Sequence, residues 1–299
     1  MKKVKYIHLD DLDGLSVLFN NNFRFELFSK IAIQFKNQKD IAKVFGVRQW
    51  TISRWKTGKS FVPISKLNLI REHSQTNSLE KGVNKIGGGK GSEPLNIRLP
   101  LEFSENLSYL CGLIITDGHL NKNLRWVQFT NKSKYLQKIF LKKIKDVFKY
   151  NKYYQNEKDR IQIYIKSKNI TIIFHCIDIP KGRKVGIITV PDIVKKSPSS
   201  VKAAFLRGCF DGDGSVSYSK KRGLRIINLA NRSKKFLEEI QVLLKEFGIE
   251  SSLTTNKFMQ SYLNITNKSN LNKFHNSVGF HHPERKEKLS TLLLSYQRP

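Results

Sequence analysis

Two stretches of the chain share one pattern of apolar positions. In Leu110–Gly118, which reads LCGLIITDG, the first, fourth and fifth residues are apolar and fall on one face of a helix. In Leu206–Gly214, which reads LRGCFDGDG, the same positions are again apolar. Seven residues make about two helical turns. The pattern therefore predicts a core helix at the start of each stretch.

Each stretch has a glycine at its third position, Gly112 in the first and Gly208 in the second. Glycine inside a helix costs about 1 kcal/mol relative to alanine. It is tolerated where another backbone approaches closely, because it has no side chain. We therefore expect the two helices to pack against each other at these glycines.

Both stretches end in an aspartate followed by glycine, as Asp117–Gly118 and Asp213–Gly214. Glycine just after a helix is typical of a C-terminus with positive φ, which we expect at both positions. An acid at that end faces the negative pole of the helix dipole, so the arrangement indicates a bound cation near the carboxylates. The alternative is two amphipathic core helices that end in ordinary Asp-Gly turns.

The elements that follow the first stretch are repeated after the second. Strand-like alternation is followed by helical periodicity, then by alternation again. The closest internal match pairs FTNKSKYLQKI, residues 129–139, with LANRSKKFLEE, residues 229–239. The predicted strands are 125–130, 160–166, 215–219, 224–229, 251–255 and 261–266. The predicted helices are 134–148, 169–177, 233–247 and 270–278. The chain therefore carries an internal repeat.

The segment Gln38–Ser60 has the pattern of a helix-turn-helix. Ile41, Ala42 and Phe45 give a first helix an apolar face, and Gly46 suits the tight turn. Inward-facing Ile52 and Trp55 leave a polar face on the second helix, with residue types that contact phosphates and base edges. The residues expected on that face are Arg48, Gln49, Thr51, Arg54 and Lys56. A helical hairpin with a merely basic face is the alternative.

A polar, glycine-rich stretch follows at residues 74–95, and we interpret it as a flexible basic linker. It includes Gly87–Ser92, where Gly91 after Lys90 excludes a phosphate-binding P-loop. The predicted division is therefore an N-terminal domain at 1–73, the linker, and two repeated units at 96–196 and 197–299.

Composition points to a polyanionic partner. The 299 residues carry a formal net charge of +30, with 39% apolar residues that are enough for real cores. Three cysteines are too few for a disulfide framework. We therefore expect the protein in a reducing compartment, the cytoplasm or an organelle matrix, and do not expect it to be secreted. The sequence shows no Cys/His cluster at zinc spacing, no membrane-length apolar run and no signal peptide.

The two stretches resemble the motif of the LAGLIDADG homing endonucleases, in the single-chain form with two motifs. The resemblance covers Leu101 to the C-terminus. It implies an α+β fold: a pseudo-twofold pair of αββαββα units, here preceded by a small all-α helix-turn-helix domain. No intein is expected, because the chain starts with Met and has no His-Asn pair at its end.

In that family the eighth motif residue is the acid that binds a divalent metal, and this position corresponds to Asp117 and Asp213. Mg²⁺ or Mn²⁺ prefers oxygen ligands, so the backbone carbonyls of Thr116 and Gly212 are further candidates. Asp211 is given no role, because its counterpart is Ile115. The family surrounds its metals with polar and basic side chains. By local match these are Asn131, Lys132, Asn231 and Arg232. Lys184 and Lys286 are candidates for the basic residue that the family carries after its later elements. Asn131 and Asn231 have an alternative interpretation as helix N-caps.

Polar residues on the predicted strands are candidates for reading base edges in the major groove. They are Arg125, Gln128, Gln162, Tyr164 and Arg225. The alternative is a sheet with one buried face and one face that is only exposed to solvent and binds nothing.

The function that the resemblance implies is site-specific cleavage of double-stranded DNA across the minor groove, with divalent metal and short 3′ overhangs, as in intron homing. The expected partner is a long, partly asymmetric DNA target bound by a monomer. Two alternatives use the same fold: a catalytically silent DNA-binding regulator, which the presence of both acids disfavours, and a maturase that binds intron RNA.

Overall fold

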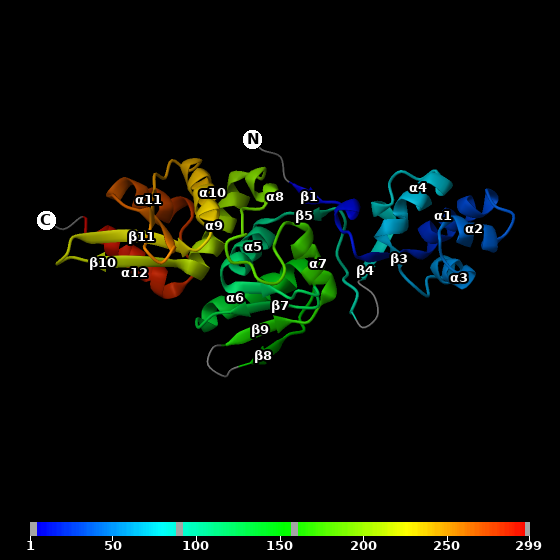
Figure 1. Cartoon of the computed structure of the whole chain (residues 1–299), viewed down its shortest axis with the longest axis horizontal. Coiled ribbons are helices and arrows are strands. Elements are labelled where there is room, and N and C mark those ends of the chain that lie inside the picture. Colours follow the sequence, from blue (N-terminus) through cyan, green and yellow to red (C-terminus); the bar gives the residue numbers. More distant parts are fainter. Residues whose placement is uncertain (1–4, 88–91, 157–160, 297–299) are drawn as a thin grey trace.

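The computed structural model describes residues 5–87, 92–156 and 161–296. Two units of the same architecture lie side by side, and a further domain lies at the N-terminal end of the molecule (Figure 1). The first unit contains α5 Glu105–Asp117, β6 Gly118–Leu120, β7 Val127–Thr130, α6 Lys134–Phe148, β8 Tyr154–Asn156, β9 Gln162–Ile165 and α7 Lys168–Cys176. After the short α8 Asp192–Lys195, the second unit contains α9 Ser199–Asp213, β10 Gly214–Ser219, β11 Leu224–Asn231, α10 Lys234–Lys245, β12 Ser252–Thr255, β13 Ser261–Ile265 and α11 Lys268–Ser277. The αββαββα order is confirmed in both units.

The two four-stranded sheets have the same topology. The strand order is β6-β7-β9-β8 in the first unit and β10-β11-β13-β12 in the second, with every pair antiparallel. The register also matches, since Gly118 pairs with Phe129 in one sheet and Gly214 with Leu229 in the other. Each position of one sheet therefore has a defined counterpart in the other. Only the second unit adds a final helix, α12 Pro283–Leu294.

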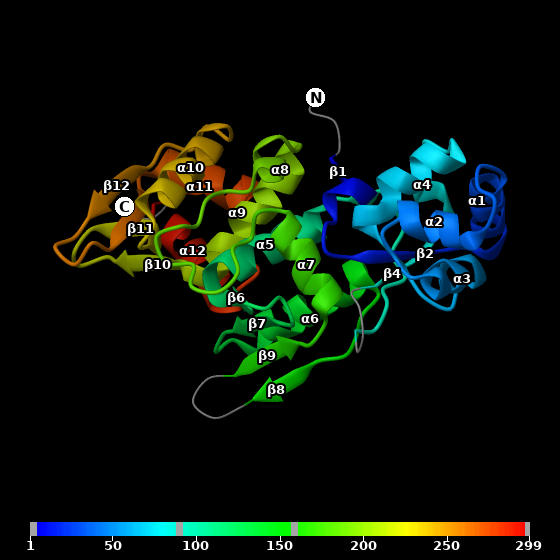
Figure 2. The same cartoon turned by 45° about the vertical axis from the view of Figure 1, so that its right-hand side comes forward.

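Helices α5 and α9 pack against each other in the middle of the molecule, and they lie next to each other in both views (Figure 1, Figure 2). The contact is close enough that a Cβ built on Gly112 would lie 2.8 Å from Cys209 N. A Cβ on Gly208 would lie 3.1 Å from Leu113 N. The predicted glycine contact is confirmed. It continues toward the C-terminal ends of the helices, where Gly212 lies against the side chain of Thr116.

The glycines that follow the two helices do not have the predicted positive φ. Gly118 has φ −104° and Gly214 has φ −79°, both in extended conformation, because β6 and β10 start at these residues. Glycine is needed there for space. A Cβ on Gly214 would lie 2.9 Å from Phe210 Cα, and one on Gly118 would overlap Ile114 in the same way. The two acids therefore stand where helix turns directly into strand.

The N-terminal domain contains the predicted helix-turn-helix. Gln38–Val44 forms α2 and Gln49–Thr57 forms α3, between α1 Asn21–Ile33 and α4 Leu67–Ser74. The turn glycine Gly46 and the C-capping Gly58 have positive φ. The prediction that this domain is all-helical is wrong, because β2 Ser16–Phe19 pairs with both β3 Val62–Pro63 and β4 Val83–Gly87. Short 3₁₀ turns occur at Leu9–Asp11, Ile64–Lys66 and Glu80–Gly82.

The range predicted to be a flexible linker, 74–95, contains regular structure. Strand β4 lies in it, and Ile86 forms a bridge with Leu95. The part of the linker prediction that concerns residues 88–91 lies outside the described residues. Apolar Val83 and Ile86 explain the strand, since they face the core under β2. The glycine-rich composition of the segment does not reveal this packing, because the packing depends on β2, which lies far from it in the chain.

The N-terminal segment also ties the domain to the first unit. Strand β1 Tyr6–Ile7 pairs with β5 Leu101–Glu102, and Gly14 lies against Ile172 of α7. Buried apolar side chains form one continuous core through all three parts of the described chain. A cut at residue 95 would remove β1 from the sheet that it shares with β5.

None of the helices in the described part of the chain is both long enough and apolar enough to cross a membrane. Cys111, Cys176 and Cys209 are free thiols.

Candidate functional site

The two motif carboxylates lie at the last residues of the paired helices. Asp117 ends α5 and Asp213 ends α9, at the same end of the helix pair. Burial first, and then the negative charge of Asp117, raise the pKa of Asp213 to about 6. The two acids are therefore close enough for each to feel the charge of the other.

An asparagine side chain contacts each acid. Asn131 donates from Nδ2 to Oδ2 of Asp117 at 2.7 Å, and Asn231 donates from Nδ2 to Oδ2 of Asp213 at 3.4 Å. The asparagines stand where β7 and β11 end. The structure thus places both predicted asparagines beside the acids.

The alternative interpretation of these asparagines as helix N-caps does not match the structure. Ser133 is the N-cap of α6 and Ser233 is the N-cap of α10, each accepting a backbone amide within the first turn. The asparagine Oδ1 atoms instead accept from the Ser133 and Ser233 amides, at 2.8 and 2.9 Å. These bonds fix each asparagine so that its amide nitrogen is directed to the acid.

Lys184 reaches the end of α5 from the loop after α7. Its ammonium donates to the carbonyl oxygens of Ile114, Ile115 and Thr116 at 2.9, 2.5 and 2.8 Å. The Ile114 carbonyl also accepts from the backbone amide of Gly118, and the ammonium compensates the negative pole of the helix dipole at this end. Burial lowers the pKa of Lys184 to about 8, while the two acids oppose that change.

Arg285, at the start of α12, has the corresponding role in the second unit. Its guanidinium donates to the carbonyls of Phe210 at 2.8 Å, of Asp211, and of Gly212 at 3.0 Å. Burial lowers the pKa of Arg285, and the nearby acids oppose this. The sequence predicted its neighbour Lys286 for this role, and Lys286 is exposed. The loop before α12 decides which side chain of α12 faces α9, and the sequence pattern does not define the course of that loop.

Two carbonyls proposed as metal ligands are therefore already hydrogen-bonded to cations. Thr116 O accepts from Lys184 and Gly212 O accepts from Arg285. A positive group at the same oxygen opposes a divalent cation there. The two carboxylates do suit one, because a cation between them would relieve the repulsion that raises the pKa of Asp213. No group of three or more His, Cys, Asp or Glu side chains forms a candidate metal site within the described ranges.

Asp211, to which the sequence assigned no role, holds the C-terminal segment against α9. Its carboxylate accepts from Tyr109 Oη at 2.7 Å and from the backbone amides of His281 and His282 at 3.0 and 2.9 Å. Burial raises its pKa and these bonds oppose the rise. The carboxylate thereby fixes the start of α12, and with it Arg285.

A cavity of about 450 Å³ opens beside Asp213. Thr116, Lys184, Asn231 and Arg232 contribute to its wall. Arg232 is exposed, as is Lys132 at the matching position of the first unit. These two cations therefore stand at the rim, where a polyanion could reach them.

Three of the polar residues predicted to read bases, Gln128, Gln162 and Tyr164, lie on the open face of the first sheet. Gln128 donates from Nε2 to Thr130 Oγ1 at 3.0 Å, and Tyr164 donates to Gln162 Oε1 at 2.6 Å. Arg125 is exposed in the turn before β7. The buried isoleucines of β9 alternate with them, as predicted.

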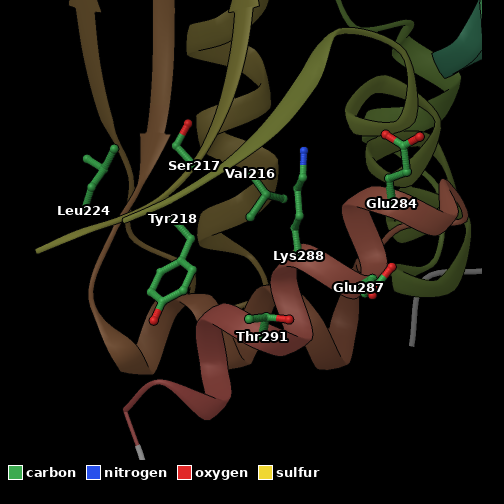
Figure 3. Close-up of a pocket in the computed structure, with 8 residues that line it drawn as sticks. All are labelled: Val216, Ser217, Tyr218, Leu224, Glu284, Glu287, Lys288 and Thr291. Carbon is green, nitrogen blue, oxygen red and sulfur yellow. The ribbon is translucent and has the colours of Figure 1, made fainter. Parts of the chain in front are cut away.

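Arg225 does not lie on the open face of its sheet. It donates from Nε to Ser295 Oγ at 2.9 Å and lies 4.6 Å from the ring of Tyr296, so it faces the C-terminal helix. Its partner Tyr218 lines a cavity of about 690 Å³ on that side (Figure 3). Residues of α12 such as Glu287 and Lys288 form the opposite wall. The extra helix of the second unit thus removes Arg225 from the predicted interface.

In the helix-turn-helix, the most exposed side of α3 carries Trp50, which was not among the residues predicted to contact DNA. Trp50 is 56% exposed and Arg54 lies over its ring at 5.8 Å. These two, with Gln49, line a shallow surface hollow. Thr51 and Lys56 flank the buried face instead, by the 100° step of a helix. The exposed tryptophan could have been found from the same helical step.

Residues 200–279 match the family model described as the LAGLIDADG-like domain. Among curated proteins, the chain is 29% identical over 204 residues to elongation factor 2 of Methanopyrus kandleri, covering 68% of this chain. It is 29% identical over 222 residues to the replication factor C small subunit of Methanocaldococcus jannaschii, covering 72% of this chain. The chain spans only 15% and 12% of those proteins. The similarity therefore concerns a small part of each of these two proteins.

Solved structures with similar chains include full-length DUF199/WhiA from Thermatoga maritima, at 17% identity and TM-score 0.45, covering 65% of this chain and 61% of that chain. They also include the homing endonuclease I-DmoI in complex with DNA and Mn, at 20% identity and TM-score 0.45, covering 59% of this chain and 97% of that chain. The chain therefore contains a LAGLIDADG-like domain at residues 200–279, and Leu110–Gly118 carries a second stretch with the pattern of the motif at Leu206–Gly214.

Proposed function

We propose that this protein is a site-specific endonuclease that cuts double-stranded DNA with a divalent metal, Mg²⁺ or Mn²⁺. The observation that carries the proposal is the pair of carboxylates, Asp117 and Asp213, at the same end of two packed helices. Each acid stands beside the open face of its own sheet, since β6 and β10 start at the next residue. One acid per half suits a substrate whose two strands are related by local twofold symmetry.

The chain's own residues would hold the DNA and keep the acids ionised. Asn131 and Asn231 donate to the acids and fix their orientation. Lys184 and Arg285 place positive charge behind the acids, which favours the carboxylate form against burial. Lys132 and Arg232 stand exposed at the rim, where they can contact phosphates.

Asp117 and Asp213 are the residues that would hold the metal. A bound divalent cation supplies an activated water and stabilises charge on the phosphate and on the leaving oxygen.

Binding without cleavage is the second candidate. The observation that favours it is the occupation of the Thr116 and Gly212 carbonyls by cationic side chains, which leaves fewer oxygens for a metal. This regulator would use the same sheets and the same basic surface.

The experiment that separates the two uses the full chain and a library of randomised duplexes. Duplexes that bind in EDTA are selected first, and the selected pool is then incubated with Mg²⁺ or Mn²⁺. Double-strand breaks at one position, absent in EDTA, are the expected result. Selective binding with no breaks in either metal would establish the regulator instead, and a pool without enrichment would contradict both.

A further inference from the structure

The open faces of the two sheets can be compared residue by residue, because their strand order and register coincide. One row across the first sheet consists of His119, Gln128, Tyr164 and Tyr154. The corresponding row across the second sheet consists of Ser215, Asn228, Asn264 and Ser252. The same backbone therefore presents large rings in one half and short polar side chains in the other.

The rings of the first sheet form a continuous layer. His119 lies 5.5 Å from Trp126, Trp126 lies 5.3 Å from Tyr164, and Tyr164 lies 6.0 Å from Tyr154, between ring centroids. Lys166 lies 4.8 Å above the ring of Tyr154. Tyr154 is 53% exposed. These rings stand on the face opposite the buried side chains of the strands, so packing of the core does not account for them.

The row of the second sheet has no ring and no charge. Ser215 donates to Asn228 Oδ1 at 2.9 Å, and Asn264 donates to Thr254 Oγ1 at 3.2 Å. The aromatic residue of this face, Tyr262, lies away from the row, in the wall of the cavity beside Asp213. The exposed chemistry of the row is thus amide and hydroxyl groups.

The two chemistries match different features of the major groove. Thymine presents a 5-methyl group, which apolar side chains contact. Adenine presents N7 and the N6 amino group, and one asparagine amide can form two hydrogen bonds to them, donating to N7 and accepting from N6. Neighbouring rings of the first sheet lie at 48° to 74° to each other, so they present an apolar layer rather than separate platforms for unpaired bases.

We propose that the two sheets read their half-sites by different means, which rests on the proposed binding of duplex DNA. The first sheet reads thymine methyl groups through Trp126, Tyr164 and Tyr154. The second sheet reads adenine edges through Asn228 and Asn264. The target is therefore asymmetric in chemistry as well as in sequence.

The test measures binding of the full chain in EDTA to a duplex selected from a randomised library. Uracil in place of thymine removes only the methyl groups, and 7-deazaadenine in place of adenine removes only N7. Each replacement is made in one half-site at a time. Uracil should weaken binding about fourfold per methyl group contacted, in one half only. Deazaadenine should weaken it about tenfold or more, in the other half only.

Two variants assign the effects to the sheets. Trp126→Ile with Tyr164→Asn gives the first sheet the residues found at the matching positions of the second, and should abolish the uracil effect alone. Asn228→Ala with Asn264→Ala should abolish the deazaadenine effect alone. The comparison of modified duplexes uses the unaltered protein, so it decides the matter even if a variant does not fold.

Three outcomes would overturn the inference. Equal uracil effects in both halves, or none in either, would contradict methyl reading while leaving duplex binding intact. Single-stranded DNA that competes as well as the duplex would assign the rings to stacking on unpaired bases. Failure to select any duplex would remove the proposed function itself, and this inference with it.

Discussion

The two units hold the same acid at the same place with different side chains. In the first unit, Asp117 accepts a hydrogen bond from Asn131 at 2.7 Å, and Lys184 donates to the carbonyls at the end of the helix. In the second unit, Asp213 accepts a hydrogen bond from Asn231 at 3.4 Å, and Arg285 donates to the carbonyls at the end of the helix. Arg285 comes from α12, an element that has no counterpart in the first unit.

The repeat therefore constrains the backbone more than it constrains the surroundings of the site. Both halves need a glycine contact, a helix-to-strand transition and a cation over the helix end. Each need can be met from any nearby element that carries the right side chain. The two strands of a bound duplex would therefore meet similar acids in unequal surroundings.

The largest effect is expected from removing either acid. Asp117→Asn and Asp213→Asn should each lower double-strand cleavage more than about 100-fold, since residues that merely orient metal ligands already contribute 10–100-fold. DNA affinity should change little. Cleavage of a supercoiled plasmid that carries the selected site, with binding measured in EDTA, checks both. Full double-strand cleavage by one variant would mean that the halves are not both catalytic.

The next largest effect concerns the helix contact that both units share. Gly112→Ala and Gly208→Ala should each lower the free energy of unfolding by about 3 kcal/mol or more, because the new Cβ meets backbone atoms that cannot move aside. Gly186→Ala is the control. Its φ is +81° but nothing lies within 4 Å of the new Cβ, so a cost of about 1–2 kcal/mol is expected. Urea unfolding measures all three, and equal costs would contradict the close contact.

The cations at the helix ends should matter in both units. Lys184→Met and Arg285→Met should each lower cleavage by about 10–100-fold, the range for residues that orient metal ligands. Lys286→Ala is the matched control, because Lys286 is exposed and adjacent to Arg285. It should leave cleavage within about twofold at fixed salt. If Lys286→Ala lowers cleavage as much as Arg285→Met, the assignment of the second unit is incorrect.

The buried acid of the second unit should also affect stability. Its pKa rises from 3.8 to about 6 on folding, so between these pH values the folded protein keeps a proton that the unfolded chain releases. Stability then falls as pH rises from about 4 to 6 and stays lower at pH 7. Asp213→Asn removes this penalty and should stabilise the protein at pH 7 by about 1 kcal/mol or more. Thermal unfolding at pH 4.5 and pH 7 tests this, since the gain should shrink at the lower pH.

The smallest effect distinguishes two arginines at the same register. Arg125 is exposed, whereas Arg225 is held by Ser295 and Tyr296. Arg125→Ala should reduce the slope of log affinity against log salt by about 0.9, the value for one phosphate contact. Arg225→Ala should leave the slope unchanged. The same slope for both variants would mean that α12 does not withdraw Arg225 from the DNA.

Local pattern was enough to predict most of the elements. Helix α6 starts and ends at the predicted residues, Lys134 and Phe148, and β9 shows the predicted alternation. The strands of the N-terminal domain could not be predicted in this way. Strand β3 contains two residues and β4 lies in a glycine-rich context, so neither has a clear period of its own. Both exist because β2 offers them hydrogen bonds and a core to cover.

The repeat, the helix faces, the two glycines and the two acids could be predicted because each is a pattern of neighbouring residues that recurs in the second half of the chain. Tertiary structure alone decided which cation covers each helix end, that Asp211 holds the start of α12, and that Arg225 turns away from the open face. Lys184 donates to carbonyls about 70 residues before it, and Arg285 to carbonyls about 75 residues before it. Such contacts depend on how loops return to the core, and no local period encodes the course of a loop.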